Sequence, residues 1–410
     1  MSTFPGYIPE LPGIAIDRFD QTLRDRANVF FLSHGHLDHM YGLVPNDPLP
    51  GTLYVSPHTA VIVGHRYPNQ PVYRMPIRER LSLCIVPPTG EERYELCIRT
   101  VPAEHCPGSV MFYFETQTVR VLYTGDFRLS AESLAVIERD RIRPNIVYLD
   151  STFLDWEYKY FPTRQESMSL IIMRCSQWLE ADRRNIVVLW LPALYGSEEL
   201  LHQLYVCLRQ RIHVCAAQRA TYQHFAQLQD AFTDDAHGAR IHACSGKTVQ
   251  GVIVCRGSDD TDNYALMIRP SARRWRFLNP GQPFWMESKK QLYVCYSSHA
   301  SSSELVEFIR KLQPEARDIR FSVVGDEIDR KCKEKYLASL LATPVEGAIE
   351  GKEMSEVEET LSLPQNAFST GTGSKRYAGT TDQKMDWDES EEESDHANDT
   401  LPPCKMAKRC

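Results

Sequence analysis

The sequence contains no apolar run long enough to cross a membrane. One of its longest apolar stretches, residues 185–194, contains Pro192 and falls well short of the ~18–20 residues of a membrane helix. Residues 1–20 have neither a basic start nor a long apolar core, so no secretory signal is predicted. Without export, the 12 irregularly spaced cysteines are expected to be thiols or metal ligands rather than disulfide partners. We expect a nuclear or cytosolic protein with no membrane association.

A basic excess, the simplest sign of a nucleic-acid-binding chain, is also missing. The 410 residues carry 46 Lys and Arg against 54 Asp and Glu, a net charge of −8. Residues 341–410 hold 7 basic and 15 acidic side chains, which leaves 39 of each sign in residues 1–340. Any site for a polyanion must therefore be a local patch. The composition of residues 342–410 predicts a disordered acidic tail.

Alternating apolar and polar residues predict a β-rich first part and a later return of strand and helix patterns. The strand patterns of the first part lie at 29–32, 52–55, 94–101, 110–114, 119–124 and 145–149. The return consists of a strand at 291–296, a helix over 302–312 and a strand at 319–324.

An α/β segment is predicted between these parts. Thr163 and Glu166 have the spacing of a capping box, which predicts the start of a helix. A strand at 185–190, a helix over 197–208 and a strand at 211–215 follow. Because this alternation is typical of parallel sheets, we expect an inserted α/β domain.

Residues 33–39 bring four potential metal ligands together directly after an apolar strand. His34 and His36 are two residues apart, so in an extended chain they project to the same side and can reach one cation. A turn after them would direct Asp38 and His39 toward a second position. Imidazole nitrogen suits zinc, and carboxylate oxygen suits zinc or manganese. The spacing favours a metal site over a histidine-rich surface turn.

Two further loops supply the remaining ligands of a two-metal site. His105 lies between two strand patterns, and Asp126 follows the strand pattern at 119–124 beside Gly125. Either residue alone would be an ordinary loop side chain. Together with residues 33–39 they predict two adjacent cations, which would activate water and stabilise the charge that develops on a phosphodiester.

These residues resemble the metallo-β-lactamase superfamily, and further motifs narrow the resemblance. Asp150 in the string 148–153 and His299 in the string 295–302 resemble motifs of the β-CASP branch, which consists of nucleic-acid nucleases. The strings that resemble its DNA crosslink-processing and end-processing members, above all the Artemis family, are 1–4, 16–20, 106–112, 123–128 and 193–196.

The resemblance implies a fold and a domain order. The fold class is α/β: an αββα metallo-β-lactamase sandwich of two sheets flanked by helices, with an inserted α/β β-CASP domain that covers the metal cleft. The domains implied are a first part of the sandwich, the insert, the returning part and the acidic tail, at residues 1–153, 154–290, 291–341 and 342–410.

The resemblance also assigns roles to the site residues. The first metal would be held by His34, His36, His105 and Asp126, and the second by Asp38, His39, Asp126 and His299. His299 could instead protonate the 3′ leaving oxygen, and the sequence leaves both roles open. Asp17 and Asp150 would orient the ligands from behind. One or two Zn²⁺ ions are implied, and Mg²⁺ or Mn²⁺ in catalysis stays open.

A second zinc site is implied in the insert. His213, His242, Cys244 and Cys255 form a possible Cys₂His₂ set, and 241–244 matches the core of a structural zinc site in the family. The spacing from Cys244 to Cys255 is shorter than in the family. Without the resemblance, two buried thiols and two ordinary histidines would be the preferred interpretation.

Local DNA contacts are predicted where cations alternate with aromatic side chains. Such a stretch suits phosphate contact with base stacking, although it is also common on solvated surfaces. The residues concerned are Arg269, Arg273, Arg274, Trp275, Arg276 and Phe277, followed by Lys289 and Lys290.

The leading hypothesis is a nuclear, monomeric, metal-dependent endo- and exodeoxyribonuclease of non-homologous end joining. It would cut hairpins, overhangs and ends to leave 5′-phosphate and 3′-hydroxyl groups. The alternative is an Apollo-like 5′-exonuclease of crosslink repair or telomere end processing. A small-molecule hydrolase does not predict Asp150, the insert and His299, and a scaffold without catalysis would be expected to have lost ligands.

Partners follow from the resemblance and from the tail. DNA, the DNA-dependent protein kinase and end-joining factors are implied, although the kinase and ligase contact motifs of the longer family tail are not found in 342–410. The acidic run 389–395 suggests a phosphate mimic that competes with DNA, and Ser390 and Ser394 lie within it as acidophilic kinase sites.

Overall fold

The computed structural model describes residues 3–77, 79–191, 195–244, 248–249, 252–253, 255, 264–314 and 318–342. Met1–Ala342 forms one compact unit. The expected acidic tail after Ala342, with Ser390 and Ser394, and the motif positions Ala193 and Leu194 lie outside the described residues. Among the helices that the structure describes, none combines the length and the apolar character needed to cross a membrane.

Two sheets face each other in the first lobe of Met1–Ala342. The smaller sheet is parallel, in the order β1-β2-β3-β4. The larger sheet has the order β19-β9-β8-β7-β6-β5, parallel from β19 to β8 and antiparallel from β8 to β5. The strands are β1 (Gly13–Ile16), β2 (Ala27–Leu32), β3 (Thr52–Val55), β4 (Val72–Arg74), β5 (Arg80–Ile85), β6 (Tyr94–Pro102), β7 (Val110–Glu115), β8 (Arg120–Tyr123), β9 (Ile146–Leu149) and β19 (Ile319–Phe321).

Aromatic side chains fill the space between these sheets. Phe31 of β2 points away from its neighbours Phe30 and Leu32, as the two-residue period of a strand requires. Its ring centroid lies 5.2 Å from that of Phe112 and 5.0 Å from that of Phe114, both on β7. Phe30 and Leu32 belong to a different buried cluster, on the opposite face of the small sheet. Both faces of β2 are therefore buried, which fixes the strand that leads into residues 33–39.

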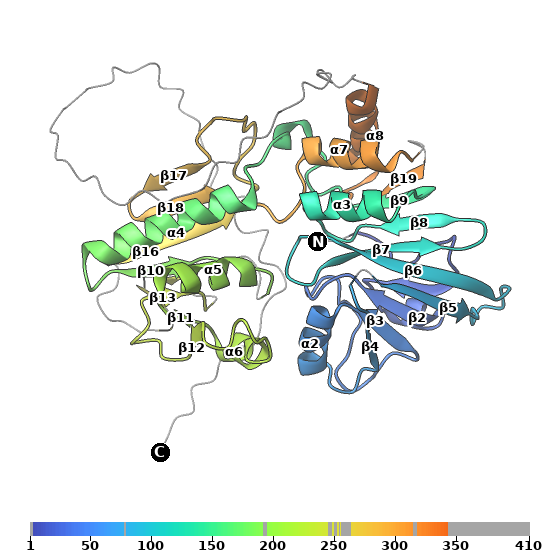
Figure 1. The fold of residues 1–410 in the computed structure, drawn as a ribbon, viewed down its shortest axis with the longest axis horizontal. Helices are drawn as coiled ribbons and strands as arrows, with labels where there is room; N and C mark the ends of the chain where they lie inside the picture. The colour runs from blue at the N-terminus through green and yellow to red at the C-terminus, as the bar shows by residue number, and fades with distance from the viewer. Residues whose placement is uncertain are drawn as a thin grey trace, which may run out of the picture. The chain divides into compact units, whose positions relative to one another are not determined.

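Helices cover the outer faces of both sheets, as Figure 1 shows. Leu23 of α1 and Ile62 of α2 pack on the small sheet. Val136 of α3, Phe308 of α7 and Leu337 of α8 pack on the large one. The bounds are α1 (Gln21–Arg24), α2 (Pro57–Arg66), α3 (Ala131–Arg139), α7 (Ser302–Leu312) and α8 (Glu327–Ala342). The predicted αββα sandwich is confirmed.

The insert has a sheet of its own, in the order β12-β11-β13-β10-β16-β18-β17. Its strands are parallel from β12 to β18, and β17 is antiparallel, which confirms the predicted α/β insert. The elements are η1 (Trp156–Tyr158), α4 (Arg164–Ala181), β10 (Ile186–Leu189), α5 (Glu198–Leu208), β11 (Ile212–His213), α6 (Ala216–Tyr222), β12 (Phe232–Thr233), β13 (Ile241–His242), β14 (Thr248–Val249), β15 (Val252–Ile253), β16 (Ala265–Ser271), β17 (Trp285–Ser288) and β18 (Gln291–Cys295).

The insert sheet extends past the expected boundary at residue 290. The strand Gln291–Cys295 pairs with β16, with Arg269 opposite Tyr293, and with β17 on its other side. The chain therefore returns to the sandwich only after Cys295. At the start of the insert, Thr163 and Glu166 form the predicted capping box, with the Thr163 N–H donating to Glu166 Oε2 at 2.8 Å.

Candidate metal centre

The predicted ligand residues converge from the ends of several strands. His34, His36 and His39 follow β2, and Asp126 follows β8. His105 follows β6, and His299 follows β18 of the insert sheet. Because sheet edges hold these loops at fixed distances, residues up to 265 positions apart in sequence meet in one place.

Inward-facing ring nitrogens and one carboxylate oxygen define the centre. His36 Nδ1 lies 3.0 Å from His34 Nε2 and 3.0 Å from His105 Nε2. The carboxylate oxygen Oδ2 of Asp126 lies 3.3 Å from His39 Nε2. The same oxygen is 3.8 Å from His105 Nε2 and 4.0 Å from His34 Nε2. These distances suit atoms that share a cation rather than atoms packed against one another.

The outer nitrogen of each of these five imidazoles, in contrast, meets an oxygen. Ser33 gives its single hydroxyl proton to Asp17 Oδ2 at 2.5 Å, so its oxygen accepts from His34. The other acceptors are a carboxylate or a backbone carbonyl, which can only accept. The pairs are His34 Nδ1 with Ser33 Oγ (2.9 Å), His36 Nε2 with the Tyr195 carbonyl (3.0 Å), His39 Nδ1 with Asp17 Oδ2 (2.9 Å), His105 Nδ1 with the Ser298 carbonyl (3.0 Å) and His299 Nδ1 with Asp150 Oδ2 (2.8 Å).

These partners assign the ring protons and provide a test of fit for a metal. A neutral imidazole that donates outward presents a lone pair inward. Three such lone pairs, on His34, His36 and His105, would then face one another at about 3 Å and repel. A cation between them removes the repulsion, and outward donation to oxygen is the usual arrangement of metal-bound histidines. His39 Nε2 is likewise buried without a hydrogen-bond partner. The residues present fit bound cations.

Electrostatics at the centre separates the histidines into two kinds. Burial, with the neighbouring imidazoles, holds the pKa of His34 and His105 well below the ordinary value, so both rings are neutral near pH 7. Burial opposes the charged form of His39 as well, but Asp126 and Asp17 raise its pKa well above the ordinary value. Although burial raises the pKa of Asp126, His39 and His299 hold it well below the usual range. A cation would compete with a proton at His39.

Asp17 and Tyr123 support the centre from behind. Asp17 is buried and accepts from the Ser33 N–H at 2.6 Å, the Tyr123 hydroxyl at 2.9 Å and His39 Nδ1 at 2.9 Å. Its φ of 55° lies in the left-handed region, which is uncommon for a residue with a side chain. One carboxylate thus fixes both the start of the 33–39 loop and the ring of His39.

Asp150 has the corresponding position behind His299. Its Oδ1 accepts from the Thr152 N–H and hydroxyl, and its Oδ2 accepts from the Phe127 N–H and His299 Nδ1. His299 Nε2 then lies 3.9 Å from Asp126 Oδ2. Asp38 is exposed, with its Oδ2 3.9 Å from His39 Nε2, so it stands at the open side of the centre.

The four insert residues also come together. Ligand atoms of His213, His242, Cys244 and Cys255 lie within 4.8 Å of one another, although the spacing from Cys244 to Cys255 is short. His242 Nε2 donates to the Ala239 carbonyl at 3.1 Å, which leaves its Nδ1 facing Cys255 Sγ at 3.3 Å. His213 Nδ1 is buried without a hydrogen-bond partner. The hydrogen bond from Cys244, together with His213 and His242, lowers the pKa of the Cys255 thiol.

The predicted DNA-contact residues lie on the insert, where several already have partners. The guanidinium of Arg269 lies 4.1 Å from the ring centre of Trp190, and that of Arg274 lies 4.0 Å from the ring centre of Tyr293. Arg276 pairs with Glu157 at 3.4 Å. The other positions are the exposed Arg273, the partly buried Trp275, the exposed Phe277, and Lys289 with Lys290 in the turn between β17 and β18.

Several residues of the centre were missed in the sequence. Tyr123 and Ser33 could have been suspected from their places beside Asp126 and His34. The carbonyls of Tyr195 and Ser298 carry no side-chain signature. Arg128, quoted only as part of a motif, is buried and donates to the carbonyls of Ser297 and Pro162 and to Glu304.

Comparison with known proteins identifies relatives that align with three quarters or more of the chain. Residues 226–317 match the family described as DNA repair metallo-beta-lactamase. Protein artemis of Gallus gallus is 31% identical over 341 residues, which cover 77% of this chain and 47% of that protein. Protein artemis of Homo sapiens is 30% identical, covering 80% and 51%. 5′ exonuclease Apollo of Mus musculus is 31% identical over 313 residues, covering 75% and 53%.

The chain spans about half the length of the curated relatives it matches. Its sandwich, its insert and its convergent histidines agree with the family match, and the family implies metal binding. The chain belongs to the DNA repair metallo-β-lactamase family of Artemis-like proteins.

Proposed function

We propose that the protein is a metal-dependent deoxyribonuclease of DNA double-strand break repair. It hydrolyses phosphodiester bonds at hairpins, overhangs and ends during non-homologous end joining. The observation that supports this most is the set of five imidazoles that donate outward to oxygen and face inward around Asp126. The matches to artemis proteins support the substrate. The second candidate is a 5′-exonuclease, supported by the match to Apollo.

We assign His34, His36, His105 and Asp126 to a first cation, and Asp38, His39, Asp126 and His299 to a second. Zn²⁺ suits the imidazoles, and Mg²⁺ or Mn²⁺ suits the open, carboxylate-rich side at Asp38. When bound, the cations polarise the phosphodiester and lower the pKa of the attacking water.

The side chains of the chain itself supply orientation in this mechanism. Asp17 and Asp150 fix the rings of His39 and His299 through their outer nitrogens, so the inner nitrogens stay aimed at the position proposed for the second cation. Asp126 stands between both ligand groups, and its carboxylate would supply negative charge to the cations when they are bound. No separate general base is required.

The insert cluster is proposed as a structural Zn²⁺ site. Two thiols and two imidazoles within 4.8 Å are the ligands of a closed tetrahedral site, and a lowered thiol pKa favours metal binding. In a Cys244→Ser variant, the zinc content should fall by one ion per chain while DNA hairpin cleavage by the folded protein persists.

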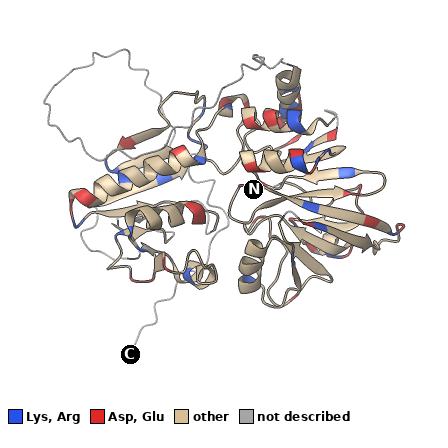
Figure 2. Cartoon of the chain, in the orientation of Figure 1, with Lys and Arg blue, Asp and Glu red and all other residues tan. Residues whose placement is uncertain are grey.

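The proposed DNA contacts extend from the insert to an exposed aromatic pair. Trp156 is 64% exposed and Phe277 is 50% exposed, with ring centroids 5.0 Å apart. Exposed aromatic rings beside arginines such as Arg276 suit the stacking of unpaired bases. Figure 2 shows Lys and Arg interspersed with Asp and Glu along the described part of the ribbon, in keeping with the balanced charge of residues 1–340. The contacts proposed are Arg273, Arg274, Trp275, Arg276, Lys289 and Lys290, together with the aromatic pair Trp156 and Phe277.

Nuclear localisation, a monomeric state and partnership with the DNA-dependent protein kinase and end-joining factors complete the proposal. The match to a DNA repair family supports action in the nucleus, whereas the monomeric state and these partners remain expectations from the sequence.

Cleavage assays on labelled DNA test the nuclease proposal. A hairpin with blocked ends should be cut, whereas a 5′-exonuclease requires a free 5′ end and would leave it intact. His36→Ala and Asp38→Ala should abolish cleavage without loss of fold, and His237→Ala, an exposed histidine, should cut like the wild type. Wild-type cleavage by both site variants would overturn the mechanism.

A further inference from the structure

His36 depends on the insert for its orientation. Its outer nitrogen, Nε2, donates to the carbonyl of Tyr195 at 3.0 Å, 159 residues further along the chain. His34 and His39, in contrast, are held by Ser33 and Asp17, which belong to the sandwich. One ring of the centre is therefore fixed by a turn in a different domain.

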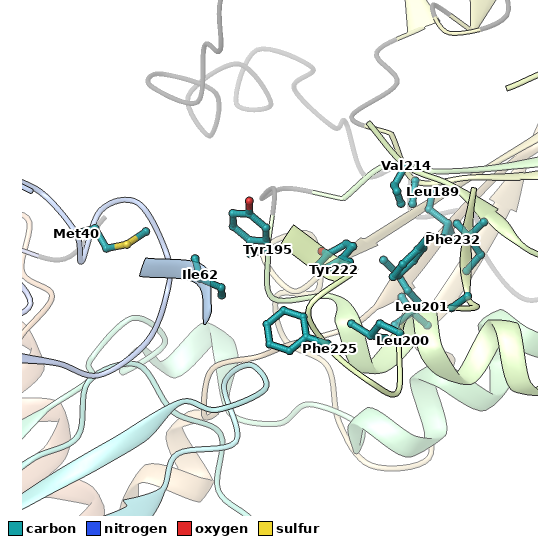
Figure 3. Packing of buried hydrophobic residues seen from close by; sticks show 14 of the residues in the cluster. Met40, Ile62, Leu189, Tyr195, Leu200, Leu201, Val214, Tyr222, Phe225 and Phe232 are labelled. Carbon is teal, nitrogen blue, oxygen red and sulfur yellow. The ribbon is translucent and has the colours of Figure 1, made fainter. Parts of the chain in front are cut away.

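That turn is held at several points. The Gly196 N–H lies 3.0 and 2.8 Å from the two carboxylate oxygens of Glu198. The Tyr195 hydroxyl bonds with Thr221 Oγ1 at 2.8 Å, and the Tyr222 hydroxyl bonds with Glu198. Figure 3 shows Tyr195 and Tyr222 beside each other in the buried cluster that also contains Met40 and Ile62 of the sandwich.

Glu198 is an unusual residue for this position. It is 3% exposed, and burial raises its pKa. A buried carboxylate is costly unless hydrogen bonds compensate for the lost water. Glu198 is the first residue of α5, where an acidic side chain is favoured by the helix dipole, but its bonds to Gly196 point back into the turn.

Gly196 allows the turn to approach His36. Its φ is +107°, a backbone conformation that residues other than glycine rarely adopt. A Cβ added at this position would lie 2.4 Å from His36 Nε2. A side chain at this position would displace either the imidazole or the turn.

We propose that the 195–198 turn, clamped by Glu198, is a positioning element for His36. The Tyr195 carbonyl keeps the proton on Nε2, so Nδ1 presents its lone pair to the cation shared with His34 and His105. Glu198 acts through Gly196 and Tyr195 and touches no reacting atom. The inference rests on the proposed function, and it makes cation affinity at the centre depend on the insert.

Metal affinity distinguishes positioning from simple stabilisation of α5. Variants Glu198→Ala, Glu198→Gln and Glu199→Ala would be loaded with Co²⁺ and titrated with a chelator, with thermal unfolding measured in parallel. Glu199 is the matched control, because it is the next residue and pairs with Arg164. Absorption from cobalt–thiolate bonds reports the Cys244 and Cys255 cluster separately, and the weaker visible bands report the imidazole centre.

We expect Glu198→Ala to weaken Co²⁺ binding at the imidazole centre roughly 10- to 100-fold and to alter its visible bands, as loss of a supporting partner does. Its thiolate absorption should not change. Glu198→Gln retains an acceptor for Gly196 and should recover most of the affinity, and Glu199→Ala should match the wild type. In DNA cleavage, kcat should fall while KM stays within about twofold.

Gly196→Ala provides a second route if Glu198→Ala does not fold. It should lower the same affinity through the contact with His36. Wild-type affinity and visible bands in every folded variant would overturn the proposal. A wild-type protein that binds Co²⁺ but cleaves no DNA would instead overturn the proposed function, and the effect of Glu198→Ala on affinity would still be measurable.

Discussion

At the scale of single residues, the centre depends as much on acceptors as on ligands. Asp17 shows this most clearly, because one carboxylate receives bonds from Ser33, Tyr123 and His39. Each bond removes an alternative orientation, so the inner nitrogen of His39 has one direction available.

Replacing Asp17 by Asn tests this role. The amide has one acceptor oxygen and brings two N–H donors toward groups that already donate, so His39 or Tyr123 loses its partner. We expect cation affinity to fall roughly 10- to 100-fold and unfolding free energy to fall by about 1–3 kcal/mol. Chelator competition and denaturant unfolding measure the two effects. Asp25→Asn, on the exposed C-cap of α1, is the control, and equal affinities in the two variants would contradict the prediction.

The sequence pointed to the cluster of candidate ligands, and the resemblance implied Asp17 and Asp150 behind it, but the acceptors for His36 and His105 were not predicted, for a physical reason. His34, His36, Asp38 and His39 form a local pattern whose spacing alone points to metal binding. The acceptors for His36 and His105 are backbone carbonyls 159 and 193 residues away. A carbonyl is present at every residue, so no composition or spacing marks these two.

At the scale of elements, four helices of the sandwich were missed, the single-turn α1 and the longer α2, α3 and α8. α2 begins with Ser56 as N-cap and Pro57 at its first position, a start signal that was present but not used. α3 has the comparable cap Ser130. In α8 the buried residue is Leu337 alone, so the apolar periodicity was too weak to detect. In the insert, the strands β10, β11 and β18 and the longer helices α4 and α5 were predicted, whereas the two-residue strands β12 and β13, the exposed strand β17 and the strand β16 were not.

The α2 helix also carries a histidine that should make stability depend on pH. His58 stacks on Phe225 of the insert with ring centroids 4.0 Å apart, and burial lowers its pKa from 6.5 to about 4. The unfolded chain therefore binds the proton more readily, and this contribution to stability is complete above pH 6.5 and is lost as the pH falls toward 4. The full loss is on the order of 3 kcal/mol.

His58→Phe keeps the stacking and removes the titration. As the pH is lowered from 6.5 to 4, the unfolding free energy of the wild type should fall relative to that of the variant. Denaturant unfolding at several pH values, with the same metal loading for both proteins, measures it. If the unfolding free energies of the two proteins change with pH by the same amount, His58 does not contribute to the pH dependence of stability.

The turn between β17 and β18 offers a test of the DNA contacts in which a loss of DNA binding cannot be explained by a loss of stability. Lys289 and Lys290 have φ of 46° and 64°, values that suit Asn and Gly in a two-residue hairpin turn. A Lys289→Asn, Lys290→Gly double variant should be more stable by about 0.5–1 kcal/mol. If both lysines contact phosphates, the DNA affinity of the double variant should fall. The slope of log affinity against log salt concentration should also become shallower by close to two, because about two fewer counterions are released on binding. Unchanged salt dependence would remove both residues from the contact surface.

At the scale of the whole molecule, charge balance and metal binding are connected. Residues 1–340 carry 39 charges of each sign, and the acidic ones include Asp17, Asp38, Asp126 and Asp150. Cations at the proposed centre would offset these carboxylates, so side-chain counting understates its attraction for phosphate. The neutral total therefore does not argue against DNA as a substrate.

The remaining net charge of −8 belongs to residues 343–410, and removing them tests whether they compete with DNA. Leu340 and Leu341 pack against the core beside α7, so the chain should be cut after Ala342. If the acidic run 389–395 occupies the DNA site, the truncated protein should bind hairpin DNA several-fold more tightly at ~50 mM salt, and the difference should shrink near 200 mM as screening increases. A full-length variant with Asn and Gln in place of the acidic residues of 389–395 separates charge from length. Equal affinity of all three proteins at low salt would contradict the prediction, and a gain confined to the truncated protein would assign the effect to length.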